Sequence, residues 1–258
     1  MGILEGKRIV ITGVLTDASL AYATAELALA EGARIVLTGA GRGLSMTQRM
    51  GRKLSSEVEV FELDVTQPVH FDQLTLALSA KWGAVDGALH AVGYAPASCL
   101  GDGMLSAPWD DVATALHISA YSLKPLAQCL LPLFEKAGGG SLVGLDFDNS
   151  RQAWPAYDWM GVAKVALEAL NRYLARDLGH LNVRCNLVAA GPIKTMAAKS
   201  IPGFAKFEEV WGEKAPLGWD ITDPSAVAKA CVALLSDWFP KTTAEVIHVD
   251  GGFHAIGA

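Results

Sequence analysis

Short apolar runs alternate with longer stretches of helical periodicity along most of the chain. Each run is rich in Val, Ile and Leu and is only four to seven residues long, which predicts strands that are buried on both faces. The seven predicted strands are residues 8–12, 34–38, 58–63, 86–92, 141–145, 183–188 and 246–249.

The stretches between these strands predict helices, at residues 20–31, 44–54, 68–82, 109–134, 157–178 and 224–236. Strands that alternate with helices form a parallel sheet. The fold class is therefore α/β: a single-domain, Rossmann-like doubly wound sheet of about seven parallel strands, with helices on both faces, over residues 1–258. Ligands of such sheets bind beyond the carboxyl ends of the strands. Residues 195–219 lack a clear period, and we expect them to form a mobile substrate-binding lid.

Composition narrows the location and the partners of this domain. The chain has 258 residues, of which 51% are hydrophobic, yet no run approaches the roughly 18 uncharged apolar residues of a membrane span. The first residues lead directly into a strand and show no signal peptide, so we expect a cytoplasmic protein that does not enter a membrane. A net charge of −6 without a basic block argues against a nucleic-acid partner.

Cysteine and histidine spacing argues against disulfides and metals. The four cysteines are scattered and form no C-x-x-C pair, and the six histidines show no H-x-x-x-H spacing. Free thiols and no metal site are therefore expected.

The end of the first strand suggests a nucleotide site. Gly13 permits a tight turn there. Ser19 stands at the start of the next helix, where a hydroxyl and free backbone N–H groups can hold a pyrophosphate. The stretch is not G-x-G-x-x-G, however, and Ser19 by itself is equally well explained as a helix cap.

Three further strand ends carry similar signals. Asp64 and Val65 follow the third strand, Gly93 follows the fourth, and A-G-P-I-K-T (190–195) follows the sixth. An Asp and a backbone N–H suit an adenine edge, and a glycine allows a ribose to approach. Taken singly, each is more simply a turn Asp or a loop glycine. Four signals at the carboxyl ends of strands together favour a dinucleotide.

Candidate chemistry lies in D-F-D-N-S-R-Q-A-W-P-A-Y-D-W-M-G-V-A-K (146–164). Tyr157 and Lys164 are seven residues apart, so on a helix they share one face at about 10 Å along the axis. A phenol beside an ammonium can stabilise a carbonyl oxygen that gains charge. A half-buried Tyr and a solvated Lys remain the plainer alternative for this pair taken alone. None of the five tyrosines is followed by Lys four residues later.

These motifs together resemble the short-chain dehydrogenase/reductase superfamily, and within it the NADH-dependent enoyl-acyl-carrier-protein reductases of the mycobacterial, isoniazid-target type. Ordinary members of the superfamily carry Tyr-x-x-x-Lys, whereas the enoyl reductases use the Tyr-x6-Lys that Tyr157 and Lys164 supply. The likeness covers nearly the whole chain and extends to H-I-S-A-Y-S (117–122), N-L-V-A-A-G-P-I (186–193), A-L-L-S-D-W (233–238) and D-G-G (250–252).

The resemblance implies a role for each matched residue. Tyr157 binds the thioester carbonyl and stabilises the enolate, Lys164 holds the nicotinamide ribose, and Phe147 guides hydride or substrate or else is only an aromatic wall. Met160 and the lid line the acyl pocket. The implied cofactor-binding residues are Gly13, Ser19, Leu20, Asp64, Val65, Val92, Gly93, Lys164, Ile193 and Thr195.

The resemblance also implies the cofactor and partners. NADH is expected, but no carboxylate follows the second strand and Arg42 stands there, so NADPH is not excluded. The substrate is an enoyl thioester on acyl carrier protein or CoA, and the assembly is a homotetramer. The lid is shorter than in the mycobacterial type, which leaves acyl length open. A carbonyl reductase and a non-catalytic NAD-binding protein of the same fold are the alternatives.

Overall fold

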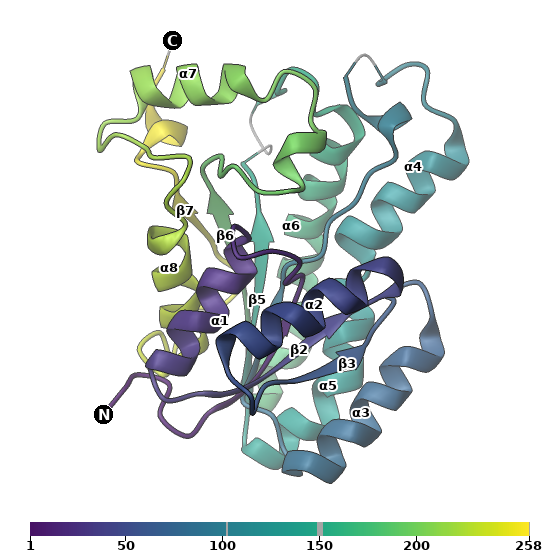
Figure 1. Cartoon of the computed structure of the whole chain (residues 1–258), viewed down its shortest axis with the longest axis vertical. Helices are drawn as coiled ribbons and strands as arrows, with labels where there is room; N and C mark the ends of the chain where they lie inside the picture. Colours follow the sequence, from purple (N-terminus) through teal and green to yellow (C-terminus); the bar gives the residue numbers. More distant parts are fainter. Residues whose placement is uncertain (102, 149–151, 258) are drawn as a thin grey trace.

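The computed structural model describes residues 1–101, 103–148 and 152–257, and their centre is one seven-stranded sheet (Figure 1). All strand pairs are parallel, in the order β3-β2-β1-β4-β5-β6-β7. The strands are β1 (Arg8–Thr12), β2 (Arg34–Gly39), β3 (Glu59–Glu62), β4 (Gly87–His90), β5 (Gly140–Asp146), β6 (Val183–Ala190) and β7 (Val246–Val249). This order confirms the predicted doubly wound fold, and its reversal between β1 and β4 opens a crevice at the carboxyl ends.

Helices cover both faces of the sheet, as the alternating pattern predicted. On one face α3, α5 and α6 pack against the strands in a cluster that includes Leu74, Leu130 and Leu167. On the other face α1 and α8 contribute Ala25 and Cys231. The helices are α1 (Leu20–Ala30), α2 (Gly41–Leu54), α3 (Pro68–Trp82), α4 (Trp109–Leu116), α5 (Leu123–Ala137), α6 (Asp158–Leu178), α7 (Ala205–Lys214) and α8 (Ser225–Leu235).

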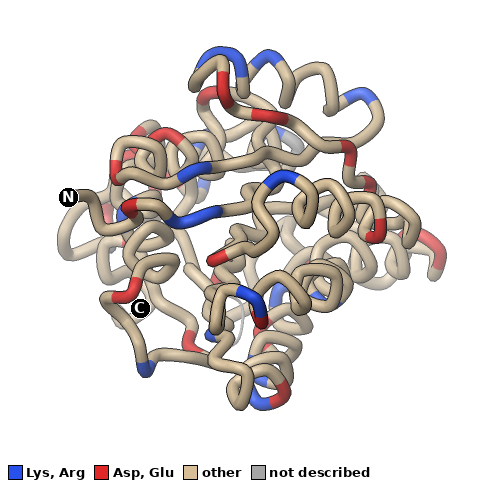
Figure 2. Tube along the Cα trace, turned by 90° about the horizontal axis from the view of Figure 1, so that it is seen from below, with Lys and Arg blue, Asp and Glu red and all other residues tan. Residues whose placement is uncertain are grey.

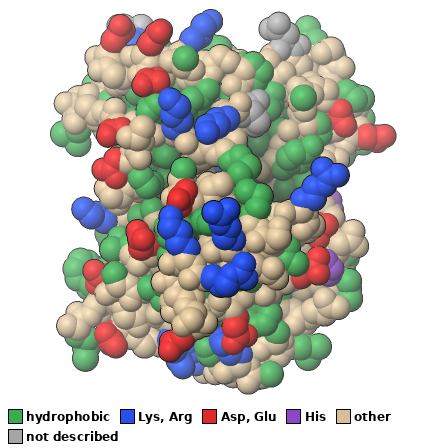
Figure 3. All heavy atoms as spheres, in the orientation of Figure 1, with side chains coloured by type: hydrophobic (Ala, Val, Ile, Leu, Met, Phe, Trp, Pro, Cys, Tyr) green, Lys and Arg blue, Asp and Glu red, His purple; other side chains and the backbone are tan. Residues whose placement is uncertain are grey.

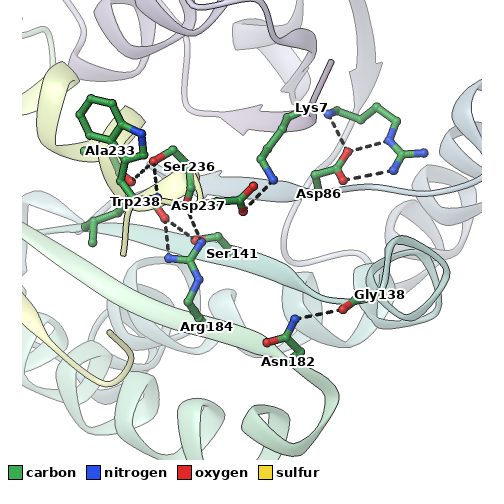
Figure 4. A network of polar contacts seen from close by, with 12 residues as sticks. Lys7, Asp86, Gly138, Ser141, Asn182, Arg184, Ala233, Ser236, Asp237 and Trp238 are labelled. Atoms are coloured by element: carbon green, nitrogen blue, oxygen red, sulfur yellow. Dashed lines mark hydrogen bonds and ion pairs between the residues drawn. The ribbon is translucent and has the colours of Figure 1, made fainter. Parts of the chain in front are cut away.

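Polar contacts hold together the amino-terminal ends of the strands (Figure 4). Arg8 of β1 holds Asp86, just before β4, through its Nε and Nη2 at 2.6 and 3.1 Å. Arg184 of β6 donates to the carbonyl oxygens of Leu234 and Ser236 at 2.8 and 2.7 Å. These bonds lie at the end of the sheet away from the carboxyl ends of the strands, where ligands of such sheets bind.

The predicted single helix over residues 109–134 is interrupted. A π-helical turn, η2 (His117–Tyr121), separates α4 from α5. Pro125 has no N–H to donate to the carbonyl of Tyr121, four residues earlier, which explains why the α-helical ladder breaks there. The Ser122 hydroxyl donates to the Ile118 carbonyl at 2.7 Å and supports the turn.

Residues 195–219, whose sequence shows no clear period, include regular secondary structure. This segment contains the short 3₁₀ turn η4 (Ala198–Ser200) and the ten-residue helix α7. Phe204, Phe207 and Trp211 are spaced three and four residues apart and pack on one side of α7, which is helical periodicity. Gly203 and Gly212, together with the charged residues between, hide that period in the sequence.

Charged residues lie mainly on outer helices and loops, with both signs interspersed along the chain (Figure 2). No helix in the described ranges is both long and apolar enough to cross a membrane. Each of the four cysteines is a free thiol, and Cys99, Cys185 and Cys231 are buried.

Candidate active site

A cavity of about 660 Å³ opens at the carboxyl ends of the strands, beneath the segment that carries α7. On the face drawn in Figure 3, hydrophobic side chains lie in a band across the upper middle, above a group of Lys and Arg side chains. Every residue proposed from the sequence as catalytic, cofactor-binding or substrate-binding lines this cavity: Gly13, Ser19, Leu20, Asp64, Val65, Val92, Gly93, Phe147, Tyr157, Met160, Lys164, Ile193 and Thr195. The fold thus brings them to one place, and what each does there stays a prediction.

Gly13 makes the tightest backbone approach in the cavity. Its φ is +80°, and a Cβ there would lie 2.1 Å from the carbonyl oxygen of Ala91. Only glycine combines that conformation with that contact. The turn after β1 can therefore cross the end of β4 and leave its own backbone facing the cavity.

Ser19 is a helix cap, as one reading of the sequence held. Its Oγ accepts a hydrogen bond from the Tyr22 N–H at 3.1 Å and donates to the Thr16 carbonyl at 2.8 Å. The cap fixes the start of α1 beside the cavity, which Ser19 and Leu20 both line. A helix N-terminus held in this way suits a phosphate group.

Asp64 is held ionised at the far end of the same cavity. Burial by itself would raise the pKa of its carboxyl group, but hydrogen bonds from the Thr66 N–H (2.9 Å) and hydroxyl (2.7 Å) outweigh that cost, so the pKa is lowered. The nearby His70 and His117 act in the same direction. This end also includes Thr38, Gly39 and Ala40, and no carboxylate stands at residues 38–42.

Tyr157 lies at the start of α6 with its ring buried. Burial, with a smaller effect from Asp146, raises the pKa of its phenol well above the ordinary value, so the hydroxyl keeps its proton and acts as a donor. The residues on either side, Ala156 and Asp158, have φ of +62° and +32°. Hydrogen bonds from the N–H groups of Gly101 and Gly103 to the Ala156 carbonyl and to Asp158 Oδ2 hold this strained turn.

Lys164 points back toward β5, two turns along α6 from Tyr157. Its Nζ donates to the Leu145 carbonyl at 2.8 Å. Burial lowers the pKa of the ammonium group, and Asp146 opposes that shift. His90 is buried near Lys164, and burial together with the lysine's charge lowers its pKa to about 3. His90 is therefore neutral, and its Nε2 pairs with the Ser122 hydroxyl at 2.7 Å.

Phe147 joins the polar and apolar parts of the cavity. Its ring lies 5.2 Å from that of Tyr157 and 5.7 Å from that of Trp211 on α7. Met160 and Phe204 line the cavity as well. An apolar chain that enters here would pass between α6 and α7 and end beside the phenol.

Some lining residues were not predicted. Asp146, the first residue of the candidate stretch 146–164 and the last of β5, lines the cavity beside Lys164, although the sequence assigned it no role of its own. Leu100 and Ile118 also line it, and neither carries a signal that distinguishes it from the core. Across the described ranges, no group of three or more His, Cys, Asp or Glu side chains is placed to hold a metal ion.

Comparisons with known proteins agree with this geometry. A family described as "Enoyl-(Acyl carrier protein) reductase" matches residues 13–254. The chain is 46% identical to an NADH enoyl-acyl-carrier-protein reductase of Mycolicibacterium smegmatis, with 97% of each chain covered. It is 43% identical to the reductase of the same description from Mycobacterium avium, again over 97% of each chain, and 38% identical to that of Aquifex aeolicus, over 100% of this chain and 94% of the relative.

Proposed function

The chain belongs to the enoyl-(acyl carrier protein) reductase family, and from that premise we propose that it uses NADH to reduce the trans-2 double bond of an enoyl thioester in fatty-acid biosynthesis. The observation that carries the proposal is the meeting of Tyr157 and Lys164 in one cavity with the turn at Gly13. A phenol donor, a buried ammonium and a cradle for a dinucleotide are the parts that such a reduction needs.

The residues present fit a dinucleotide. Gly13 leaves a backbone cradle that a Cβ would fill, and the capped start of α1 suits the pyrophosphate. Asp64 and Val65, which line the cavity, would hold an adenine edge, and Lys164 lines it on the side of Tyr157. NADH, when bound, supplies the hydride that reaches the β-carbon of the substrate.

The protein's own groups do the rest of the chemistry. The Tyr157 hydroxyl, kept protonated by burial, donates a hydrogen bond to the thioester carbonyl and stabilises the negative charge that develops on its oxygen. Lys164 is anchored on the Leu145 carbonyl and offers its remaining N–H groups to ribose hydroxyls. Phe147, which packs against Tyr157, limits how far the acyl chain can move and keeps water from the reacting carbons.

The substrate and assembly are proposed at the same level. The relatives are described as reductases of enoyl-acyl carrier protein, and we extend this to CoA thioesters because the cavity lining is mainly apolar and selects for the acyl chain. Met160 and residues 195–219, including α7, form the acyl side as a lid. A homotetramer in the cytoplasm completes the proposal; four free thiols suit that compartment.

NADPH is a second candidate cofactor. The end of β2 offers Thr38, Gly39 and Ala40 to the cavity without a carboxylate to repel a 2′-phosphate, and the exposed Arg42 follows in the first turn of α2. An arginine so placed accommodates a 2′-phosphate in related folds.

A steady-state assay with trans-2-enoyl-CoA substrates of increasing length, run with NADH and with NADPH, tests the proposal. We expect turnover with NADH and an optimum of chain length set by the cavity. Reduction of simple ketones in place of enoyl thioesters would support the carbonyl-reductase alternative. Tight NADH binding without turnover at any chain length would support the non-catalytic alternative.

A further inference from the structure

Asp146 is a buried carboxyl group that the mechanism above does not use. It is 5% exposed, and neither of its oxygens meets a donor at hydrogen-bond geometry within the described residues. Burial raises the pKa of this group to about 7, the Lys164 ammonium and the Phe147 backbone N–H oppose the rise, and Glu168 and Asp148 add to it. Burying a carboxyl group without a hydrogen-bond donor makes the folded state less stable. A role outside the fold would explain why Asp146 is kept in this position.

The placement of Asp146 gives one. Leu142 of β5 packs on the face that α5 and α6 cover, while Val143 packs on the opposite face. Because side chains alternate along a strand, Asp146 lies on the same side as Leu142 and points toward α6. Its backbone neighbour Leu145 accepts the hydrogen bond from Lys164, and both Asp146 and Lys164 line the cavity.

The two side chains have complementary hydrogen-bonding capacity. An ammonium group only donates, whereas a carboxylate only accepts. A sugar hydroxyl both donates and accepts, so Lys164 by itself can satisfy its oxygen but not its hydrogen. Buried hydroxyls are costly unless both capacities are met. Two free acceptor oxygens beside Lys164 supply the missing half.

We propose that Asp146 is a cofactor-binding residue, whose carboxylate accepts a hydrogen bond from a hydroxyl of the nicotinamide ribose while Lys164 donates to the same sugar. The inference rests on the proposed function, since it requires a dinucleotide in this cavity. It assigns Asp146 to cofactor binding rather than to the fold, and it treats the unpaired oxygens as the feature that the ligand completes.

Binding measurements with three ligands test this directly. NADH and ADP-ribose both carry the second ribose, and ADP lacks it. We expect Asp146→Leu to weaken the binding of NADH and of ADP-ribose about tenfold or more, because a hydrogen bond to a charged group is lost. The affinity for ADP should stay within about twofold of the wild type. Asp146→Asn keeps one acceptor oxygen and should show a smaller loss in the same order. NADH fluorescence titration and competition by ADP-ribose and ADP give the constants.

Glu168→Gln is the matched control. Glu168 is also a buried carboxylate near Lys164, one turn further along α6, but it does not line the cavity. This variant should leave the affinity for all three ligands within about threefold, so the effect of removing a buried carboxyl group from this region is separated from the loss of a direct contact.

The thermal stability of the ligand-free protein separates binding from structure. If Asp146 holds the ligand, the ligand-free Asp146→Leu and Asp146→Asn variants should unfold at the same temperature as the wild type or at a higher one. NADH should raise the unfolding temperature of these variants less than it raises that of the wild type. Unchanged NADH affinity in both variants, or an equal loss for NADH, ADP-ribose and ADP, would overturn the inference. A wild type that binds no NADH would instead overturn the proposed function.

Discussion

At the scale of single residues, burial decides which proton donors the cavity can use. The phenol of Tyr157 stays protonated because burial raises its pKa above the ordinary value. Burial instead lowers the pKa of the Lys164 ammonium group, which favours its neutral form. Asp146 moderates the second effect by favouring the charged ammonium. Tyr157 is thus suited to donate a hydrogen bond, and Lys164 to hold a polar ligand.

This division of roles predicts different kinetic losses for two substitutions. Tyr157→Phe removes a donor to the developing oxyanion, so kcat should fall about a hundredfold while the dissociation constant for NADH remains near that of the wild type. Lys164→Met should instead weaken NADH binding by at least tenfold. Steady-state kinetics and NADH titration on both variants check this, and a Tyr157→Phe enzyme with undiminished kcat would remove Tyr157 from the mechanism.

Asp146 should give the stability of the ligand-free protein a distinct pH dependence. Its pKa is raised from 3.8 to about 7 in the folded state, so the folded protein holds a proton that the unfolded chain has already lost. The contribution of this group to the free energy of unfolding is therefore greatest below about pH 4, falls as pH rises from 4 to 7, and is constant above 7.

Asp146→Asn does not titrate, so its advantage over the wild type should be small at pH 4.5 and should grow by up to about 1.4 kcal/mol per pH unit toward pH 7. Urea unfolding of both proteins at pH 4.5, 6 and 8 measures the difference. The other titrating groups cancel in this comparison, so a difference that stays constant over the three pH values contradicts the assignment.

At the scale of elements, aromatic rings hold α7 against the rest of the domain. Trp211 stacks on Phe253 with ring centroids 3.9 Å apart and planes at 15°, and it also lies 5.0 Å from Trp154. Phe207 of the same helix meets Phe147 at 5.8 Å. α7 thus contacts Phe147, the residue that packs on Tyr157, and we predict that loosening α7 would also loosen the site.

Trp211→Ala should loosen α7 without unfolding the domain. Replacing a buried Trp by Ala costs about 3 kcal/mol or more, and here the loss falls on a small cluster separate from the two main cores. Hydrogen exchange should become faster in peptides from α7 and stay unchanged in peptides from β5. Trp238→Ala removes a 69% exposed Trp and serves as the control. Equal acceleration in β5 would show that α7 is part of the global fold.

The strands were more predictable than the elements around the site. β1 and β7 begin and end at the predicted residues, because each is a short β-branched run bounded by charged or turn residues in the sequence. The period of α7 is interrupted by Gly212 and by charges on its outer face, and the π turn depends on where Pro125 falls relative to the surrounding packing. Such features require knowledge of which residues meet across the fold.

The same contrast applies within the site. Gly13 and Tyr157 could be found from the sequence, since a glycine after a strand and a Tyr-x6-Lys spacing are local patterns. Asp146 could not, because its meaning comes from burial and from the lack of a donor among the described residues, and both are properties of the folded chain. Cofactor preference at Arg42 likewise depends on what surrounds the end of β2.

At the scale of the whole molecule, α6 exposes an apolar stripe on the side away from the sheet. Val162 and Val165 are both 38% exposed, and Tyr173 is 59% exposed. These residues are separated by three and eight positions, so they share one face of the helix. Tyr121, between α4 and α5, is a further exposed aromatic at 51%. Exposed apolar side chains on one helix face suit an interface between subunits, which supports the proposed homotetramer.

Val165→Glu should therefore break the assembly. A charge at the centre of an apolar interface is buried without a partner and costs several kcal/mol for each copy. We expect light scattering after size-exclusion chromatography to give the mass of a tetramer for the wild type and of dimers or monomers for this variant.

Val69→Glu places the same charge at a 52% exposed valine of α3 and should leave the tetramer intact, so the two variants separate a lost interface from a general effect of added charge. A wild type that runs as a monomer at micromolar concentration, or a Val69→Glu variant that dissociates as readily as Val165→Glu, would contradict the assignment of α6 to the interface. Since α6 also carries Tyr157 and Lys164, dissociation should in addition lower the affinity for NADH, because the helix that positions both residues loses its outer support.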